Sequence, residues 1–293
     1  MATSGRSDHA AFRRALRRSA GTLARPLPWI HHAEPWAVLV SEVMLQQTQT
    51  SRVLGPWTRF LEAFPTPTAC ANAPLSDVLR LWSGLGYHRR AKSLHDAATM
   101  IRDEFDGAVP TRASDLRRLP GIGEYSANAV GTFAFGHRVA VVDTNVGRVL
   151  ARALANRTLS VRDARVEANE LLPRTNAASF NQAMLDLGAL FCTSTPHCDT
   201  CPVSRVCKWN REGGPDPAPR SAGVSRAQST FRGSDRQVRG RVIAALRERP
   251  RLTKHLLASI EGVDARRGQA LIAGLVADGL IEQRGRLVHL KGD

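Results

Sequence analysis

The sequence contains few cysteines, few lysines and no long apolar run. Its 293 residues include five cysteines, too few for a disulfide-stabilised scaffold of this length. No uncharged apolar run reaches the roughly 18 residues that a membrane helix requires, and the N-terminus lacks the compact apolar stretch of a signal peptide. These absences argue against a disulfide-rich secreted protein and against a membrane protein. We expect a cytoplasmic protein that makes no membrane contact.

Acidic residues are also scarce relative to basic ones. The chain has 41 Lys and Arg against 26 Asp and Glu, a net charge of +15. The preference for Arg over Lys is typical of GC-rich coding DNA, but that bias does not explain the excess of basic over acidic residues. The charge favours a polyanionic partner, and nucleic acid is the first candidate.

The hydrophobic pattern predicts an all-helical body. The length is sufficient for about two domains. Apolar residues recur at spacings of three and four, and no sustained alternation of period two precedes residue 280. We expect helices over 51–63, 75–82, 88–104, 124–135, 237–247, 253–260 and 264–279. The last three, followed by a short hairpin, indicate a small winged-helix shape.

Four of the five cysteines form one cluster, Cys192, Cys198, Cys201 and Cys207, with the spacing C-x5-C-x2-C-x5-C. Four thiolates this close in sequence can surround one metal centre. Zinc sites usually present two tight Cys-x-x-Cys pairs, whereas only the central pair is tight here, which suits a [4Fe-4S] cluster somewhat better. The spacing leaves both metals open. Cys70 stands apart and is predicted to be an ordinary buried thiol.

A short glycine motif, Leu119-Pro120-Gly121-Ile122-Gly123, lies between two predicted helical stretches. Gly121 and Gly123 let the backbone turn tightly and point N–H groups outward at a helix start, where a phosphate can bind. The motif has the form of a helix-hairpin-helix DNA element. A plain helix–helix connection is the alternative.

Two carboxylates and a polar string are candidates for chemistry. Glu42 lies in the apolar helical stretch 37–45, where its acidic form is favoured, as a general acid near neutral pH requires. A carboxylate at a groove rim or paired with an arginine is the alternative. Asp143 opens a helix, where Asp is an N-cap by default. Residues 46–50 (QQTQT) could hydrogen-bond DNA or form a solvated helix end.

Taken together, these motifs resemble those of adenine DNA glycosylases, members of the helix-hairpin-helix, iron–sulfur superfamily that also contains endonuclease III. The similar strings are 41–49 (SEVMLQQTQ), 81–87 (LWSGLGY), 119–123 (LPGIG), 142–146 (VDTNV) and the four cysteines, in that order. The resemblance covers about residues 25–210. It implies a monomeric enzyme with a [4Fe-4S] cluster that removes adenine mispaired with 8-oxoguanine or guanine, after flipping the base out of double-stranded DNA.

The resemblance also assigns roles to residues. It implies that Glu42 protonates the adenine ring and helps to place the attacking water, while Asp143 stabilises the oxocarbenium-like sugar. Tyr125 and Asn145 match residues that support this pair. The expected DNA contacts, including an apolar wedge beside the lesion-bearing strand, are Gln46, Gln47, Thr48, Leu85, Tyr87, Gly121 and Gly123.

Tyr125 separates this chain from some relatives. Enzymes similar to endonuclease III carry a lysine at this position, and without that amine no imine with the sugar can form. The resemblance therefore implies a monofunctional glycosylase. Thymine-removing mismatch glycosylases share the tyrosine and are the first alternative. They lack the string around Glu42, and its presence here argues for adenine. A non-catalytic DNA-binding regulator is the second, and the two carboxylates argue against it.

Three features depart from the family pattern. The first cysteine gap has five residues where six are commoner, and His88 replaces a tyrosine. Residues 229–293 are too short and too helical for the Nudix-like C-terminal domain that reads 8-oxoguanine, so the preference for 8-oxoguanine over guanine is open. The basic string 230–241 either contacts DNA or leads into a helix.

The predicted organisation is that of a two-lobed helix-hairpin-helix glycosylase. Its parts are an N-terminal helix packing on the iron–sulfur lobe (1–30), a six-helix lobe with the hairpin (31–138), the iron–sulfur lobe (139–210), a Gly/Pro/Ser-rich linker (211–228) and a C-terminal helical, winged-helix-like domain (229–293).

Overall fold

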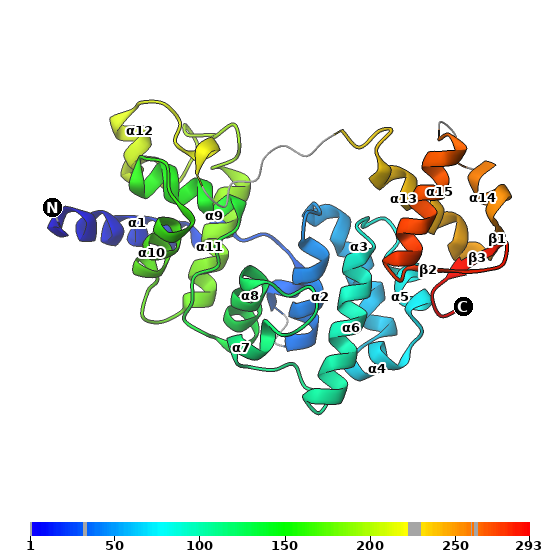
Figure 1. Ribbon diagram of the computed structural model, residues 1–293. Helices are drawn as coiled ribbons and strands as arrows, with labels where there is room; N and C mark the ends of the chain where they lie inside the picture. Colours follow the sequence, from blue (N-terminus) through cyan, green and yellow to red (C-terminus); the bar gives the residue numbers. More distant parts are fainter. Residues whose placement is uncertain (1, 32–33, 222–229, 259, 261–262) are drawn as a thin grey trace. The chain divides into compact units, whose positions relative to one another are not determined.

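The computed structural model describes the chain except for residues 1, 32–33, 222–229, 259 and 261–262. The fold is mostly helical, as predicted (Figure 1). The chain divides into two compact units, one built from residues 1–30 and 127–227, the other from 31–126 and 228–293. In the described part of the chain, no helix has both the length and the apolar character needed to cross a membrane.

The unit that contains residues 31–126 is a helical body built on aromatic side chains. Its helices are α2 (Pro35–Leu45), α3 (Thr50–Ala63), α4 (Pro67–Asn72), α5 (Leu75–Leu81), α6 (Arg89–Glu104), α7 (Ala113–Leu116) and the start of α8 (Glu124–Phe135). The ring of Phe60 lies 6.5 Å from that of Trp36 and 6.3 Å from that of Trp82, and all three are buried. This core closes one face of α2, and Cys70 is buried as predicted.

The C-terminal segment of this unit forms a winged helix. Its elements run α13 (Asp235–Glu248), β1 (Arg251–Leu252), α14 (Thr253–Ala258), α15 (Ala265–Ala277), β2 (Ile281–Arg284) and β3 (Leu287–Leu290). The strands pair antiparallel in the order β1-β3-β2. The three helices and the final hairpin confirm the prediction, whereas β1 was not predicted because a two-residue strand has no periodic signal. The predicted linker residues 222–228 lie outside the described residues.

Ion pairs join the winged helix to the helical body. Elements of the winged helix also contact α5 of that body (Figure 1). Asp293 accepts a hydrogen bond from Arg80 of α5 at 2.7 Å. Asp278, after α15, binds both Arg89 of α6 and Arg239 of α13. These arginines hold the pKa of the Asp278 carboxyl below its usual range. The C-terminal segment is therefore attached to the body by specific charged contacts.

The other unit packs its N-terminal helix against the cysteine-bearing segment. Its elements are α1 (Ala2–Leu23), η1 (Pro28–His31, whose last residue belongs to the other unit), α9 (Thr144–Val149), a π-helical turn η2 (Leu150–Ala155), α10 (Val161–Leu171), α11 (Ala177–Leu190), η3 (Ser204–Val206), α12 (Lys208–Glu212) and η4 (Ala218–Arg220). Phe12 and Leu16 of α1 are fully buried in one core with Leu150 and Leu187. Ala218, in the predicted linker, is also fully buried there.

Helices α9 and α11 approach so closely that only glycine fits at one position. A Cβ atom added at Gly188 would lie 2.6 Å from the backbone oxygen of Asn145. Because that neighbour is backbone, it cannot move aside as a flexible side chain could. Gly188 thus sets the distance between the helix that carries Asn145 and the helix that leads to the cysteines.

We expect Gly188→Ala to destabilise the protein by about 1–3 kcal/mol, since overpacking forces α9 and α11 apart. Thermal unfolding followed by circular dichroism measures the loss. Gly240→Ala in α13 is the matched control, because nothing lies within 4 Å of a Cβ there and Ala is the better helix former. Equal melting temperatures for the two variants would contradict the prediction.

Candidate functional site

Glu42 lies on a buried helix, as predicted. Helix α2 begins with Pro35 at its first turn and is buried from Trp36 to Met44. Glu42 itself is only 7% exposed. The helix thus places a carboxyl group within the buried part of the helical body.

The polar string after α2 forms a turn that is bound to the hairpin. Gln46 donates from Nε2 to the backbone oxygen of Gly121 at 3.1 Å and to the Ser126 hydroxyl at 3.3 Å. Gln47 is exposed and adopts a left-handed backbone with φ +54°. A non-glycine residue in this region is strained, and such strain is concentrated at functional sites. Two expected DNA-contact motifs are thus adjacent in space.

Arg90 organises this region and was not singled out from the sequence. From Nη1 it donates to the backbone oxygens of Val43, Met44 and Gln46 at the end of α2. From Nη2 it donates to the Thr48 hydroxyl at 2.9 Å and to the backbone oxygens of Leu85 and Gly86. Burial lowers its pKa to about 10. The only sequence signal was its place in the basic string that follows Tyr87.

Residues 83–88, which we call the wedge loop, carry the next expected contacts. Gly84, Gly86 and Tyr87 have φ of +82°, +67° and +46°. The Tyr87 ring is half-buried, with the Arg90 guanidinium carbon 5.3 Å from its centroid. Leu85 is only 2% exposed, so an apolar wedge made by Leu85 requires the loop to rearrange.

The hairpin has the geometry predicted for it. Gly121 has φ +78°, and a Cβ there would lie 2.7 Å from Ser93 Cβ, so both backbone and space require glycine. Nothing lies within 4 Å of a Cβ added at Gly123, which leaves the turn open at the start of α8. Leu119 and Ile122 anchor the turn in the core. Tyr125 is half-buried in the first turn of α8.

Asp143 belongs to the other unit and caps α9. Its Oδ1 accepts from the Val146 backbone N–H and its Oδ2 from Asn145 Nδ2, both at 2.8 Å. Burial raises the pKa of Asp143, while these hydrogen bonds and the charge of Arg148 oppose the rise. The predicted N-cap is confirmed, and the cap fixes the carboxylate in place.

Arg148 connects this carboxylate to the first cysteine, a link that the sequence did not suggest. Arg148 donates from Nη2 to Asn145 Oδ1 at 2.6 Å and to the backbone oxygen of Gly188 at 2.8 Å. Its Nε donates to the backbone oxygen of Cys192 at 2.7 Å. Three hydrogen bonds therefore lead from Asp143 through Asn145 and Arg148 to Cys192.

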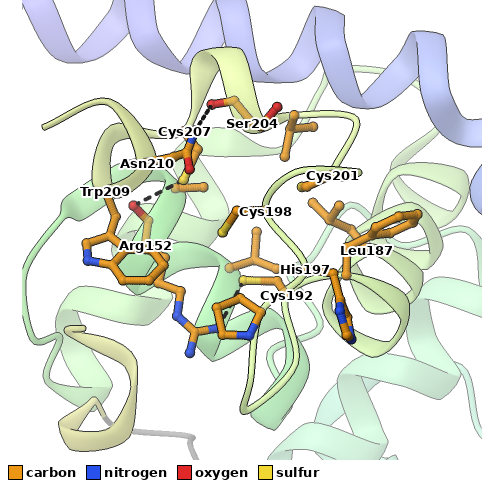
Figure 2. Close-up of a pocket in the computed structure, with 15 residues that line it drawn as sticks. Arg152, Leu187, Cys192, His197, Cys198, Cys201, Ser204, Cys207, Trp209 and Asn210 are labelled. Atoms are coloured by element: carbon orange, nitrogen blue, oxygen red, sulfur yellow. Dashed lines mark hydrogen bonds between the residues drawn. The ribbon is translucent and has the colours of Figure 1, made fainter. Parts of the chain in front are cut away.

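The four clustered cysteines line one pocket (Figure 2). None of them forms a disulfide. Arg152 and Trp209 lie on one side of the pocket and Leu187 and His197 on the other (Figure 2). Within the described part of the chain, no group of three or more His, Cys, Asp or Glu side chains is arranged to hold a single metal ion.

A buried arginine supports this pocket. Arg152 is 1% exposed and forms a two-pronged ion pair with Asp216, at 2.8 and 2.6 Å. Its Nη1 donates to Cys192 Sγ at 3.4 Å and to the Thr193 backbone oxygen at 2.7 Å. Burial raises the pKa of the Cys201 thiol to about 11. A bound cation is what would hold such thiols as thiolates at neutral pH.

The predicted site residues are divided between the units. Asp143, Asn145 and the four cysteines belong to the unit of residues 1–30 and 127–227; the other predicted residues belong to the unit of residues 31–126 and 228–293.

Comparison with known proteins gives consistent matches. Residues 40–174 match the family model described as HhH-GPD superfamily base excision DNA repair protein. The chain is 42% identical over 265 residues to the adenine DNA glycosylase of Mycolicibacterium smegmatis, covering 88% of each chain. It is 44% identical over 266 residues to that of Mycobacterium tuberculosis, covering 88% of this chain and 86% of the relative.

Solved structures agree on the fold. A thermostable thymine-DNA glycosylase matches with a TM-score of 0.65 at 25% identity, covering 71% of this chain and 98% of that one. A trapped endonuclease III–DNA covalent intermediate matches with a TM-score of 0.61 at 25% identity, covering 70% and 97%.

His88 leads to a prediction about pH. Burial, with the charges of Arg247, Arg239 and Arg90, lowers its pKa from 6.5 to about 3. Below about pH 6.5, His88 is protonated in the unfolded chain but stays neutral in the native protein. The free energy of unfolding therefore falls as the pH falls toward 3. We expect a loss of about 2–3 kcal/mol between pH 6.5 and 4 from this residue.

Urea unfolding at several pH values measures this loss. His88→Gln should show a shallower decline than the wild type, while His255→Gln, at an exposed histidine, should decline as the wild type does. Parallel curves for His88→Gln and the wild type would show that His88 does not resist protonation.

Proposed function

Because this chain belongs to the adenine DNA glycosylases of the HhH-GPD superfamily of base excision DNA repair proteins, and is thus a DNA N-glycosylase, we propose that it hydrolyses the N-glycosidic bond of adenine mispaired with 8-oxoguanine or guanine in double-stranded DNA. It would do so as a monomer in the cytoplasm, where bacterial chromosomal DNA lies. The observation that carries this proposal is the identity to adenine DNA glycosylases over most of the chain, together with a buried Glu42 and a capped Asp143.

The two carboxylates divide the work. Buried Glu42 is suited to hold a proton and to deliver it to the adenine ring, which makes the base a better leaving group. Asp143, oriented by Asn145 and the Val146 backbone N–H, then stabilises the positive charge that develops on the sugar. That charge itself favours the ionised form of Asp143, against the effect of its burial. This is the logic of a glycosidase carboxylate pair.

Three motifs of the helical body would bind the DNA. The open hairpin turn at Gly121–Gly123 presents backbone N–H groups to a phosphate. The turn at Gln46–Thr48 and the wedge loop would contact the strand opposite the adenine, with Tyr87 entering the stack to offset the loss when the adenine is flipped. Tyr125 offers no amine, so the enzyme releases the base without forming an imine.

A thymine-DNA glycosylase activity is the second candidate, because a thymine-DNA glycosylase gives a close structural match. Single-turnover excision on three duplexes separates the two. The duplexes place adenine opposite 8-oxoguanine, adenine opposite guanine, or thymine opposite guanine, each assayed with and without alkali. We expect alkali-dependent cleavage at adenine alone.

Glu42→Gln and Asp143→Asn should each abolish excision while leaving duplex binding largely intact, because both changes keep the side-chain shape and remove the chemistry. Glu104→Gln, at an exposed surface carboxylate, is the control and should keep wild-type turnover. Cleavage only at thymine would promote the second candidate. No cleavage on any duplex would favour a binding-only protein.

We further propose that one [4Fe-4S] cluster is held by Cys192, Cys198, Cys201 and Cys207. Its role would be structural, because four bonds to one cluster would stabilise the loop that carries the cysteines. In this arrangement Arg152 would donate a hydrogen bond to a ligand sulfur while it stays paired with Asp216. Arg148 would pass the position of Cys192 on to Asn145 and Asp143.

Protein purified without oxygen should contain iron and acid-labile sulfide in equal amounts and no zinc. Cys201→Ser should lose most of this iron, whereas Cys70→Ala, at a buried thiol in the other unit, should retain it. Stoichiometric zinc in the wild type would overturn the assignment.

A further inference from the structure

Helix α13 presents two arginines to the wedge loop. Arg236 donates from Nη1 to the Tyr87 hydroxyl, and its guanidinium carbon lies 5.2 Å from the centroid of the Tyr87 ring. Arg247 lies on the same face of α13, eleven residues and about three turns later. It donates to the Leu79 backbone oxygen at 3.0 Å, to the Ser83 hydroxyl at 2.9 Å and to His88 Nε2 at 3.3 Å. The C-terminal winged helix therefore contacts both ends of the loop.

The loop is of a kind that needs such support. Tyr87 has a left-handed backbone, which is strained in a non-glycine residue and persists only where the surroundings enforce it. Arg90, within the helical body, contacts the Tyr87 ring as well. Arg236 adds a second guanidinium from a different part of the chain. The conformation of Tyr87 is thus determined partly by the C-terminal segment.

The position of His88 also depends on a contact with the C-terminal segment. Its imidazole is buried and neutral, so Nε2 can accept the hydrogen bond from Arg247. Arg236 likewise contacts side chains of the protein, the rings of Tyr87 and Phe231.

We propose that α13 acts as a splint for the wedge loop, with Arg236 and Arg247 as positioning residues that hold Tyr87 ready to enter the duplex beside the mispair. This inference rests on the proposed function. The winged helix would act on DNA through Tyr87. Loss of the contacts between α13 and the wedge loop would impair base flipping rather than the chemical step at Glu42 and Asp143.

The first test needs no activity. Amide hydrogen exchange over residues 83–88 is measured in the full-length wild type and in Arg236→Ala, Arg247→Ala and Arg249→Ala. Arg249 is exposed at the C-terminal end of α13. Arg249→Ala therefore removes the same charge from the same helix as the other two variants do. Exchange should be faster in the first two variants and unchanged in the third. Unchanged exchange in all three would overturn the splint.

The second test is a double-mutant cycle in single-turnover excision of adenine opposite 8-oxoguanine. Arg236→Ala should slow excision by about tenfold in the wild type and have little effect in Tyr87→Ala, because Arg236 then has nothing to position. Arg236→Lys should fail to restore the rate, since an ammonium lacks the planar fork. Arg249→Ala should excise as the wild type does.

Salt dependence distinguishes positioning from direct contact. If Arg236 bound a phosphate, its removal would lower the slope of log affinity against log salt by about one. We expect the slope to stay unchanged. A reduced slope together with additive effects of Arg236→Ala and Tyr87→Ala would overturn the proposal. A wild type without any excision would overturn the proposed function, and the exchange measurement would still decide whether the splint exists.

Discussion

The helical body depends on one guanidinium group. Arg90 binds backbone oxygens at the end of the helix that carries Glu42, the hydroxyl of Thr48 and backbone oxygens of the wedge loop. The last carbonyls of a helix have no partner within the helix, and here one side chain satisfies several of them while it bridges to another motif. The planar fork of arginine makes this possible, and a lysine could not replace it.

Two arginines, one half-buried and one buried, have the same function in the other unit. Arg148 joins Asn145, Gly188 and Cys192, and Arg152 joins Asp216 to the cysteine pocket. Such groups are costly to bury unless their donors are satisfied, and these have several partners each. Part of the excess of arginine in the composition is therefore used inside the protein. Net charge still points to a polyanionic partner, but it overstates the number of residues that are free to bind phosphates.

The role proposed for the C-terminal segment follows from the loop that it contacts. A winged helix is often a DNA-reading module, and fold alone does not assign function. In this protein α13 contacts the same loop that the family resemblance assigns to the lesion-bearing strand. The structure thus links the C-terminal segment to the wedge loop, through Arg236, Arg247 and His88.

Much of this protein could be predicted from its sequence because the signals are local. Helical periodicity predicted the main helices, glycine pairs predicted the hairpin turn, and the cysteine cluster predicted one shared pocket. The apolar stretch around Glu42 predicted its burial, and the position of Asp143 before a helix predicted its N-cap. The resemblance added the roles that these residues are proposed to have.

The rest was decided by tertiary structure, because it depends on contacts between residues far apart in the chain. Nothing in the neighbourhood of Arg90 indicates that its side chain reaches back to Val43, and nothing near Arg148 indicates that it reaches forward to Cys192. Leu85 is apolar in a motif expected to contact DNA, yet packing buries it. Local sequence determines which helices form and where they turn; only the folded chain determines which arginine satisfies which carbonyl, since that choice requires both partners to be in place.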